Sequence, residues 1–308
     1  MVGAAVPPEE VTVRTGKGSP KSGLRGKCTR VPIAQATVAL LIGVGFAGSA
    51  SLGSLASASA TNSGSARPAG YAGPARQVTT RPGTKGFSAD FTSRNWAGYI
   101  TYASSERTDF DSVKATWVQP AVTCPKENAW TVFWIGLDGW WDDTVEQGGT
   151  SAQCIDGVPQ YESWWEMYPT VAITTVFAVN PGDKITASVV YKSSTSTYVI
   201  VVTDVTTGKT FTKDEQCASD LKCDRSSADV ITEDVGKFSG DSYFPLADYK
   251  TMKYSGSEIT DTSGNSGPIK DSHWLNAAVT ESADGTTYAT VSALNKKGNG
   301  FSATWKHD

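Results

Sequence analysis

The sequence predicts an all-β fold. Only 19% of its 308 residues are charged, whereas Ser, Thr, Gly and β-branched residues are abundant, a composition that favours strands and turns over long helices. The apolar content of 39% is sufficient for a substantial core. Short β-rich segments recur along the chain, and none has a sustained apolar period of 3.6 residues. Many short strands indicate a sandwich or a barrel.

The first sixty residues are typical of an export signal. Six basic residues precede an uncharged run from about residue 34 to residue 48, which is short for a membrane span. Two A-x-A cleavage sequences follow, at residues 56–58 and 58–60. We therefore expect residues 1–60 to be removed and the protein to be secreted, with no stable membrane association. A retained signal anchor is the alternative.

The charge of the exported part is acidic. Of the 27 basic and 31 acidic residues, six and two lie in residues 1–60, which leaves 21 basic against 29 acidic residues. A nucleic-acid partner is disfavoured because phosphate binding needs a basic face. An acidic surface also repels itself less at low pH, where carboxylates are neutralised.

The cysteines predict two disulfides. Cys28 lies in the predicted signal, which leaves four cysteines in an oxidising compartment. Three pairings are possible; we expect Cys217 with Cys223, because this pair closes a short loop, and Cys124 with Cys154. A zinc site is disfavoured because no cysteine has a CxxC neighbour and both histidines lie near the C-terminus. The sequence implies no metal and no organic cofactor.

The rest of the chain divides into two parts. Residues 61–86 are rich in Ser, Gly, Ala, Pro and Arg without periodicity, which is typical of a linker or short propeptide. Residues 87–308 contain no internal repeat and no second boundary, so we expect a single domain there. The strands are predicted at roughly 94–103, 110–119, 129–138, 143–148, 160–168, 172–179, 184–192, 197–205, 226–235, 286–294 and 299–305.

Turn chemistry supports these strands. A Pro-Gly-Asp sequence at residues 181–183 precedes one of them, and Thr-Gly-Lys at residues 207–209 follows another. Asp284-Gly285 lies inside a predicted hairpin, where this dipeptide is favoured because both positions tolerate positive φ.

Several hydrolase classes lack their residues here. A Ser-His-Asp or Cys-His site needs a histidine beside its nucleophile, and His273 has no nucleophile turn to accompany it. An aspartic peptidase needs two D-T/S-G loops, but the Asp-Thr-Ser-Gly sequence at residues 261–264 is a loose match without a second copy. If the protein is a hydrolase, carboxylates and amides must supply the chemistry.

The segment YESWWEMYP, residues 161–169, is the most informative. Alternate residues of a strand share a face, so Glu162, Trp164, Glu166 and Tyr168 lie on one side. This mixture of aromatic planes and carboxylates is typical of a substrate groove. The other side, which could be core, comprises Tyr161, Ser163, Trp165 and Met167.

Two further strands carry polar candidates. In TVEQGGT, residues 144–150, Gln147 shares a face with Val145 while Glu146 points the opposite way. In SSADVITEDV, residues 226–235, the same alternation places Glu233 between apolar neighbours. Such a carboxylate is either an edge-strand charge or a partly desolvated catalytic acid.

Six motifs together resemble the glutamic peptidase, or eqolisin, family. In chain order they are NWAGY (95–99), WVQP (117–120), WIGLDG (134–139), VEQGGT (145–150), YESWWEMYP (161–169) and ADVITED (228–234). The resemblance, to an exported bacterial-type member, implies a β-sandwich of two large antiparallel sheets, similar to concanavalin A-like jelly rolls. It places the catalytic glutamine on Gln147 and the catalytic glutamate on Glu233. It places substrate-binding residues on Trp96, Trp134, Asp138, Trp164, Glu166 and Tyr168.

The chain departs from the family pattern at two positions. Val230 replaces a tryptophan three residues before the glutamate of the fungal pattern, and Glu146 replaces a residue that is often apolar. Both departures affect the expected shape of the subsites rather than the pair itself.

A glutamate and a glutamine suffice for amide hydrolysis. Glu233 can accept a proton from water and then donate it to the leaving amine. Gln147 can donate an N–H to the oxyanion, a contribution of roughly 2.7 to 4 kcal/mol in other hydrolases. An ionised Glu166 or Asp138 nearby raises the pKa of Glu233, so we expect activity to peak in acid. We expect protein or peptide substrates. We also expect the protein to be a monomer.

Two other functions remain open at this point. A jelly-roll glycoside hydrolase could use Glu166 and Glu233 as its paired carboxylates, with tryptophans stacking on sugars. A secreted lectin-like binding module without catalysis is equally compatible with a tryptophan-rich groove. The Gln147→Ala variant discriminates between these functions, because the glycosidase does not need the amide.

Overall fold

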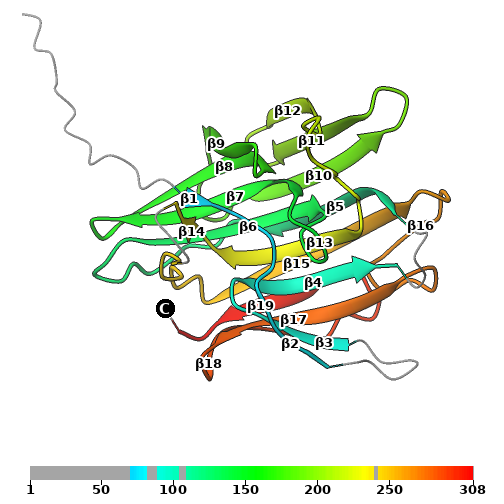
Figure 1. Ribbon diagram of the computed structural model, residues 1–308. Helices are drawn as coiled ribbons and strands as arrows, with labels where there is room; N and C mark the ends of the chain where they lie inside the picture. The colour runs from blue at the N-terminus through cyan, green and yellow to red at the C-terminus, as the bar shows by residue number, and fades with distance from the viewer. Residues whose placement is uncertain (1–69, 82–88, 104–108, 239–241, 308) are drawn as a thin grey trace, which may run out of the picture. The chain divides into compact units, whose positions relative to one another are not determined.

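The computed structural model describes residues 70–81, 89–103, 109–238 and 242–307. The predicted export signal, residues 1–60, lies outside this part of the chain. Nineteen β-strands form all the regular structure of the described residues (Figure 1). No helix long and apolar enough to cross a membrane is found among these residues.

The first sheet carries the site described below. Its seven principal strands pair antiparallel in the order β9 (Val171–Ala178), β8 (Val158–Tyr168), β7 (Val145–Ile155), β6 (Ala129–Leu137), β13 (Ser227–Asp234), β4 (Trp96–Tyr102) and β17 (Leu275–Ala283). At its end, β3 (Ala89–Ser93) joins β17 in parallel, and β2 (Gln77–Arg81) pairs with β3. A two-residue strand, β1 (Gly70–Tyr71), pairs with β14 (Gly236–Lys237).

The second sheet is also antiparallel. Its strands follow the order β12 (Lys209–Gln216), β11 (Thr197–Asp204), β10 (Lys184–Lys192), β5 (Phe110–Val118), β15 (Thr251–Asp261), β19 (Phe301–Trp305) and β18 (Thr286–Val291). The short β16 (Ser266–Gly267) pairs with β15. The β17–β18 hairpin connects the two sheets.

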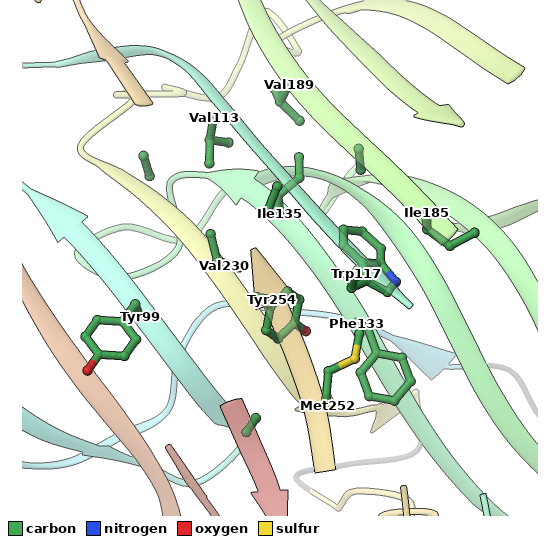
Figure 2. Packing of buried hydrophobic residues seen from close by; sticks show 14 of the residues in the cluster. Tyr99, Val113, Trp117, Phe133, Ile135, Ile185, Val189, Val230, Met252 and Tyr254 are labelled. Carbon is green, nitrogen blue, oxygen red and sulfur yellow. The ribbon is translucent and has the colours of Figure 1, made fainter. Parts of the chain in front are cut away.

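The two sheets pack face to face around one large core. Figure 2 shows Val113 and Ile185 of the second sheet beside Phe133, Ile135 and Val230 of the first. Each fully buried side chain of this size contributes roughly 1.5 to 3 kcal/mol relative to exposure. This arrangement confirms the predicted antiparallel β-sandwich.

Whether buried and exposed side chains alternate along a strand depends on where the strand lies in its sheet. In β5, Val113, Ala115 and Trp117 are buried, whereas Lys114 and Val118 are exposed, because only one face of this strand meets the core. In β6 every residue is buried, because the strand is central and both faces of its sheet are covered. The predicted strands at 110–119 and 129–138 correspond to β5 and β6.

Eight strands of the structure have no counterpart in the sequence prediction, and the longest of them are β12, β15 and β17. β12 lies at the edge of its sheet and reads KTFTKDEQ, with a charged residue at half of its positions. Charged residues on an edge strand prevent pairing with other chains, and they remove the apolar alternation that identifies a strand.

Both predicted disulfides are present. Cys124 is bonded to Cys154 with a Cα–Cα distance of 5.5 Å, and Cys217 is bonded to Cys223 at 6.0 Å. The first bond fastens the loop after β5 to the end of β7. The second closes a short loop between β12 and β13.

Candidate active site

The outer face of the first sheet carries a second cluster of buried aromatic side chains. Trp96 of β4, Trp134 of β6 and Trp164 of β8 are at most 1% exposed. The rings of Trp96 and Trp134 meet edge to face, with centroids 5.0 Å apart. The alternation predicted for residues 161–169 is confirmed, since Trp164 lies here whereas Trp165 belongs to the core between the sheets.

The predicted pair lies on this face. Gln147 of β7 and Glu233 of β13 are fully buried, on the two strands that flank β6. In the register, Gln147 faces Gly136 and Glu233 faces Val132. A Cβ atom at Gly136 would lie 2.9 Å from the Trp134 ring and 3.0 Å from Cβ of Gln147, so this glycine makes room for both side chains.

Glu233 accepts three N–H hydrogen bonds. Trp134 Nε1 donates to Oε2 at 2.9 Å, while Asn95 Nδ2 at 2.9 Å and the backbone N–H of Gly73 at 3.1 Å donate to Oε1. Burial raises the pKa of Glu233 well above its ordinary value, and the charges of Asp234 and Glu166 add to this. The hydrogen bonds from Asn95 and Gly73 act in the opposite direction, because they favour the ionised form.

Gln147 and Glu166 face each other across β7 and β8. Gln147 Nε2 donates to Glu166 Oε2 at 3.2 Å and to the carbonyl oxygen of Ala72 at 2.5 Å. The same Glu166 oxygen accepts the backbone N–H of Ala72 at 3.0 Å. Burial raises the pKa of Glu166 well above its ordinary value, although the bond from Ala72 opposes this. Glu166 thus fixes which way the Gln147 amide points.

A segment from the N-terminal side of the domain lies over this pair. In Figure 1 the chain runs from β1 across β13 and β4 to β2, and we call residues 70–77 the crossing segment. Beyond its contacts with the pair, Trp96 Nε1 donates to the carbonyl of Gly73 at 3.0 Å, and Asn95 Nδ2 donates to that of Pro74 at 3.2 Å. Ala72 and Gly73 are buried.

The crossing segment falls within residues 61–86, for which the sequence predicts a linker or short propeptide. The described part of this range, residues 70–81, forms β1 and β2 and packs against the domain. The segment binds mainly through its backbone, which explains why its small residues show no apolar pattern. The ordered body therefore begins before the predicted start at residue 87.

Asn95 is a site residue that the sequence prediction did not select. Its amide nitrogen binds Glu233, and its Oδ1 accepts hydrogen bonds from Ser93 Oγ at 3.0 Å and from the backbone N–H of Arg76 at 2.7 Å. These two donors orient the amide. The signal was present, because Asn95 opens the NWAGY motif beside Trp96.

Asp138 lies apart from the other predicted site residues. It adopts a positive φ of 68° after β6 and accepts the backbone N–H of Ser226 at 2.6 Å. Burial, with the charge of Asp142, raises its pKa to about 7. Its charge also acts on Glu146, which points away from Gln147 on β7 and is fully buried. Asp138 is not among the main influences on the pKa of Glu233, contrary to the expectation from the sequence.

The remaining predicted residues gather around the pair. Tyr168 packs against the aromatic cluster and meets the ring of Tyr71 at a centroid distance of 5.4 Å. The structure therefore brings Gln147 and Glu233 together with Trp96, Trp134, Trp164, Glu166 and Tyr168.

Residues 94–300 match the Peptidase A4 family, and the chain belongs to this family. Aspergillopepsin-2 of Aspergillus niger is 33% identical over 144 residues, which cover 44% of this chain and 48% of that protein. The chain thus spans about half the length of this curated relative.

Two solved structures share the fold. A crystal structure of scytalido-glutamic peptidase with a transition state analog inhibitor matches with a TM-score of 0.59 at 23% identity, over 69% of this chain and 98% of that chain. Aspergilloglutamic peptidase from Aspergillus niger matches with a TM-score of 0.50 at 24% identity, over 58% and 99% of the two chains.

Proposed function

We propose that the protein is a secreted, acid-acting glutamic endopeptidase whose catalytic pair is Glu233 and Gln147. One observation carries this proposal: the two side chains hold opposite ends of a single peptide group. Gln147 Nε2 donates to the carbonyl oxygen of Ala72, and Glu233 Oε1 accepts the N–H of Gly73. These are the two atoms that gain charge or a proton when an amide is hydrolysed.

Glu233 has the proton-transfer role. As a carboxylate it accepts a proton from the attacking water, and it then passes this proton to the amide nitrogen, which lies within hydrogen-bond distance of Oε1. The donors Trp134 and Asn95 hold the carboxyl group in place through both steps.

Gln147 has the oxyanion role. Its Nε2 is already directed at a peptide carbonyl, and a donor in this position strengthens its bond as negative charge develops on the oxygen. Among the described residues, no group donates to Gln147 Oε1, which leaves this atom to accept a hydrogen bond from the attacking water. Glu166 keeps the amide in this orientation.

Acid activity follows from the two glutamates. Burial raises the pKa of both glutamates, and the charge of Glu166 adds to the effect on Glu233, so the second proton is harder to remove than the first. One group can then be ionised and act as base while the other is neutral. The two disulfides support secretion, since such bonds persist in oxidising compartments.

Protein or peptide substrates fit the site better than sugars do. The groups around the pair bind backbone N–H and C=O groups of the crossing segment, and the family is one of peptidases. These observations favour a peptidase over the glycosidase and the lectin-like module. We take the monomer as the active form.

The test is digestion of a denatured protein from pH 2 to pH 8, with Glu233→Gln and Gln147→Ala in parallel. Glu233→Gln should abolish hydrolysis, because an amide cannot accept the proton of water. Gln147→Ala should lose a factor of about 10² to 10³, as expected for an oxyanion donor. Circular dichroism establishes that each variant is folded. A folded Gln147→Ala protein with near-normal proteolysis would contradict the proposal.

A further inference from the structure

We infer that the crossing segment is the first substrate of its own chain, cleaved between Ala72 and Gly73, and that it defines the peptides the site prefers. The inference rests on the proposed function. It adds a scissile bond, a residue preference on both sides of the cut, and a latent state of the intact chain.

The segment lies in the register of a substrate. The carbonyl of Ala72 accepts a hydrogen bond from Gln147, and the adjoining N–H of Gly73 meets Glu233. The bonds from Ala72 N–H to Glu166 and from Trp96 to the Gly73 carbonyl hold the backbone on either side of this peptide group. The bond presented to the catalytic pair is therefore the Ala72–Gly73 amide.

Hydrolysis of this bond balances with water alone. The oxygen of water adds to the carbonyl carbon of Ala72, and Glu233 takes one proton from it. The C–N bond breaks, and Glu233 returns the proton to the nitrogen of Gly73. The products are a carboxyl group on Ala72 and an amine on Gly73, and no oxidant or reductant is needed.

Tyr71, the second residue before the bond that is cut, has an aromatic side chain. The Tyr71 ring packs against Tyr168 at 5.4 Å and Phe238 at 5.6 Å between centroids. A Cβ atom at Gly236 would lie 2.6 Å from this ring, so the floor of the subsite requires a glycine. These contacts define a subsite for an aromatic side chain.

The residues that flank the bond are small. Ala72 is fully buried within the aromatic cluster, which leaves no exposed direction for a larger side chain. A Cβ atom at Gly73 would lie 2.9 Å from two atoms of the Tyr71 ring and 3.5 Å from Tyr168. Because the two closest contacts are with Tyr71 of the same segment, glycine is required after the cut when an aromatic residue fills this subsite. The site therefore prefers the sequence aromatic residue, alanine, glycine, with the cut before the glycine.

Occupation by this segment keeps the intact chain latent. After cleavage, the part that ends at Ala72 is held by the two-residue pairing of β1 with β14 and by the Tyr71 contacts. The part that begins at Gly73 remains attached through β2, and its departure from Asn95 and Trp96 completes the opening of the site.

The test follows the intact full-length chain after transfer from neutral pH to pH 4, by mass spectrometry and N-terminal sequencing. We expect a new N-terminus at Gly73, formed at a rate independent of protein concentration, before activity on a denatured protein appears. The Glu233→Gln variant should keep the bond intact. Cleavage of this bond in the folded variant would assign the cut to another protease and overturn the inference.

Peptides test the preference without relying on the folding of a variant. The processed enzyme should cleave a peptide of residues 70–77, Gly-Tyr-Ala-Gly-Pro-Ala-Arg-Gln, between Ala and Gly. Replacement of the second Gly by Val, or of Tyr by Ser, should slow this cut at least about tenfold, whereas replacement of the final Gln by Asn should not.

The two failures are distinguishable. If the protein digests a denatured substrate at pH 4 while its own Ala72–Gly73 bond and the peptide stay intact, the inference is overturned and the proposed function stands. If a chain truncated to begin at Gly73 is folded by circular dichroism and digests neither the denatured substrate nor the peptide, the proposed function itself fails. A first cut elsewhere in residues 61–86 also overturns the inference.

Discussion

The indole of Trp134 donates a hydrogen bond to Oε2 of Glu233, so a side chain of β6 holds the carboxyl group of the neighbouring strand β13. The two residues are on adjacent strands but not directly opposite, since Trp134 pairs with Ile231. The indole thus reaches diagonally along the sheet. This contact makes the tryptophan of the WIGLDG motif a positioning residue for the proposed base.

Trp134→Phe should therefore impair catalysis and move its pH dependence. The change keeps an aromatic ring but removes a hydrogen bond to a charged group, worth roughly 1.5 to 3 kcal/mol, or about a 10- to 100-fold loss in kcat/KM. Because the lost donor favours the ionised form of Glu233, the acid limb should shift to higher pH. The measurement is a pH–rate profile. Trp305→Phe changes a tryptophan of β19 in the second sheet, so it serves as the matched control and should leave the pH–rate profile unchanged.

Glu166→Gln should keep measurable activity and move the acid limb the other way. The charge of Glu166 raises the pKa of Glu233, and a neutral amide removes that influence, so the limb should shift to lower pH. The amide oxygen of the new Gln can still accept from Gln147. Complete loss of activity in a folded variant would assign Glu166 a catalytic role of its own.

The folded protein should be most stable in acid. Burial raises the pKa of six carboxyl groups well above their ordinary values, namely Glu146, Glu166, Asp229, Glu233, Asp234 and Glu281. The folded state then holds protons that the unfolded chain, with pKa values of about 4, has already released. This stabilisation is complete below about pH 4 and is lost as pH rises through the folded pKa values. Thermal unfolding should show a higher Tm at pH 4 than at pH 7.

Glu146→Gln should stabilise the protein at neutral pH. Burial, with the charge of Asp138, raises the pKa of Glu146, and an amide has no charge to bury. Its Tm should exceed that of the unaltered protein at pH 7, and the difference should shrink at pH 4, where Glu146 is already neutral. Glu258→Gln changes an exposed glutamate and is the control. Equal gains at both pH values would rule out ionisation of Glu146 as the cause.

The two disulfides should contribute unequally. In the chain-entropy account, a bond between residues 30 apart stabilises by about 3.6 kcal/mol, and one between residues 6 apart by about 2.2 kcal/mol. The paired changes Cys124→Ala with Cys154→Ala should therefore lower the free energy of unfolding more than the pair Cys217→Ala with Cys223→Ala. Denaturant unfolding measures both, and the reverse order would contradict the entropic account.

Strand periodicity accounts for what the sequence could predict about the site. A period of two residues places the side chains of Gln147 and Glu146 on opposite faces of the sheet, and it does the same for Trp164 and Trp165. Both assignments agree with the structure. Such patterns identify which face a side chain occupies. They do not identify its neighbours on other strands, which is why Asp138 was grouped with Glu233 although it lies beside Glu146.

The crossing segment could not be predicted, for a physical reason. Ala72 and Gly73 bind the pair through N–H and C=O groups that every residue possesses, so these hydrogen bonds leave no polar or apolar pattern in the sequence. Asn95 is different, because its side chain makes the contact, and its place in the NWAGY motif could have identified it.

Covalent attachment of the crossing segment gives it an advantage over any free peptide. A tethered ligand acts at an effective concentration on the order of millimolar, whatever the concentration of the protein in solution. A single cut of the backbone between Ala72 and Gly73 removes this advantage from the part that ends at Ala72, which then dilutes into the surroundings. The change is irreversible because dilution, rather than a weaker contact, prevents the fragment from returning.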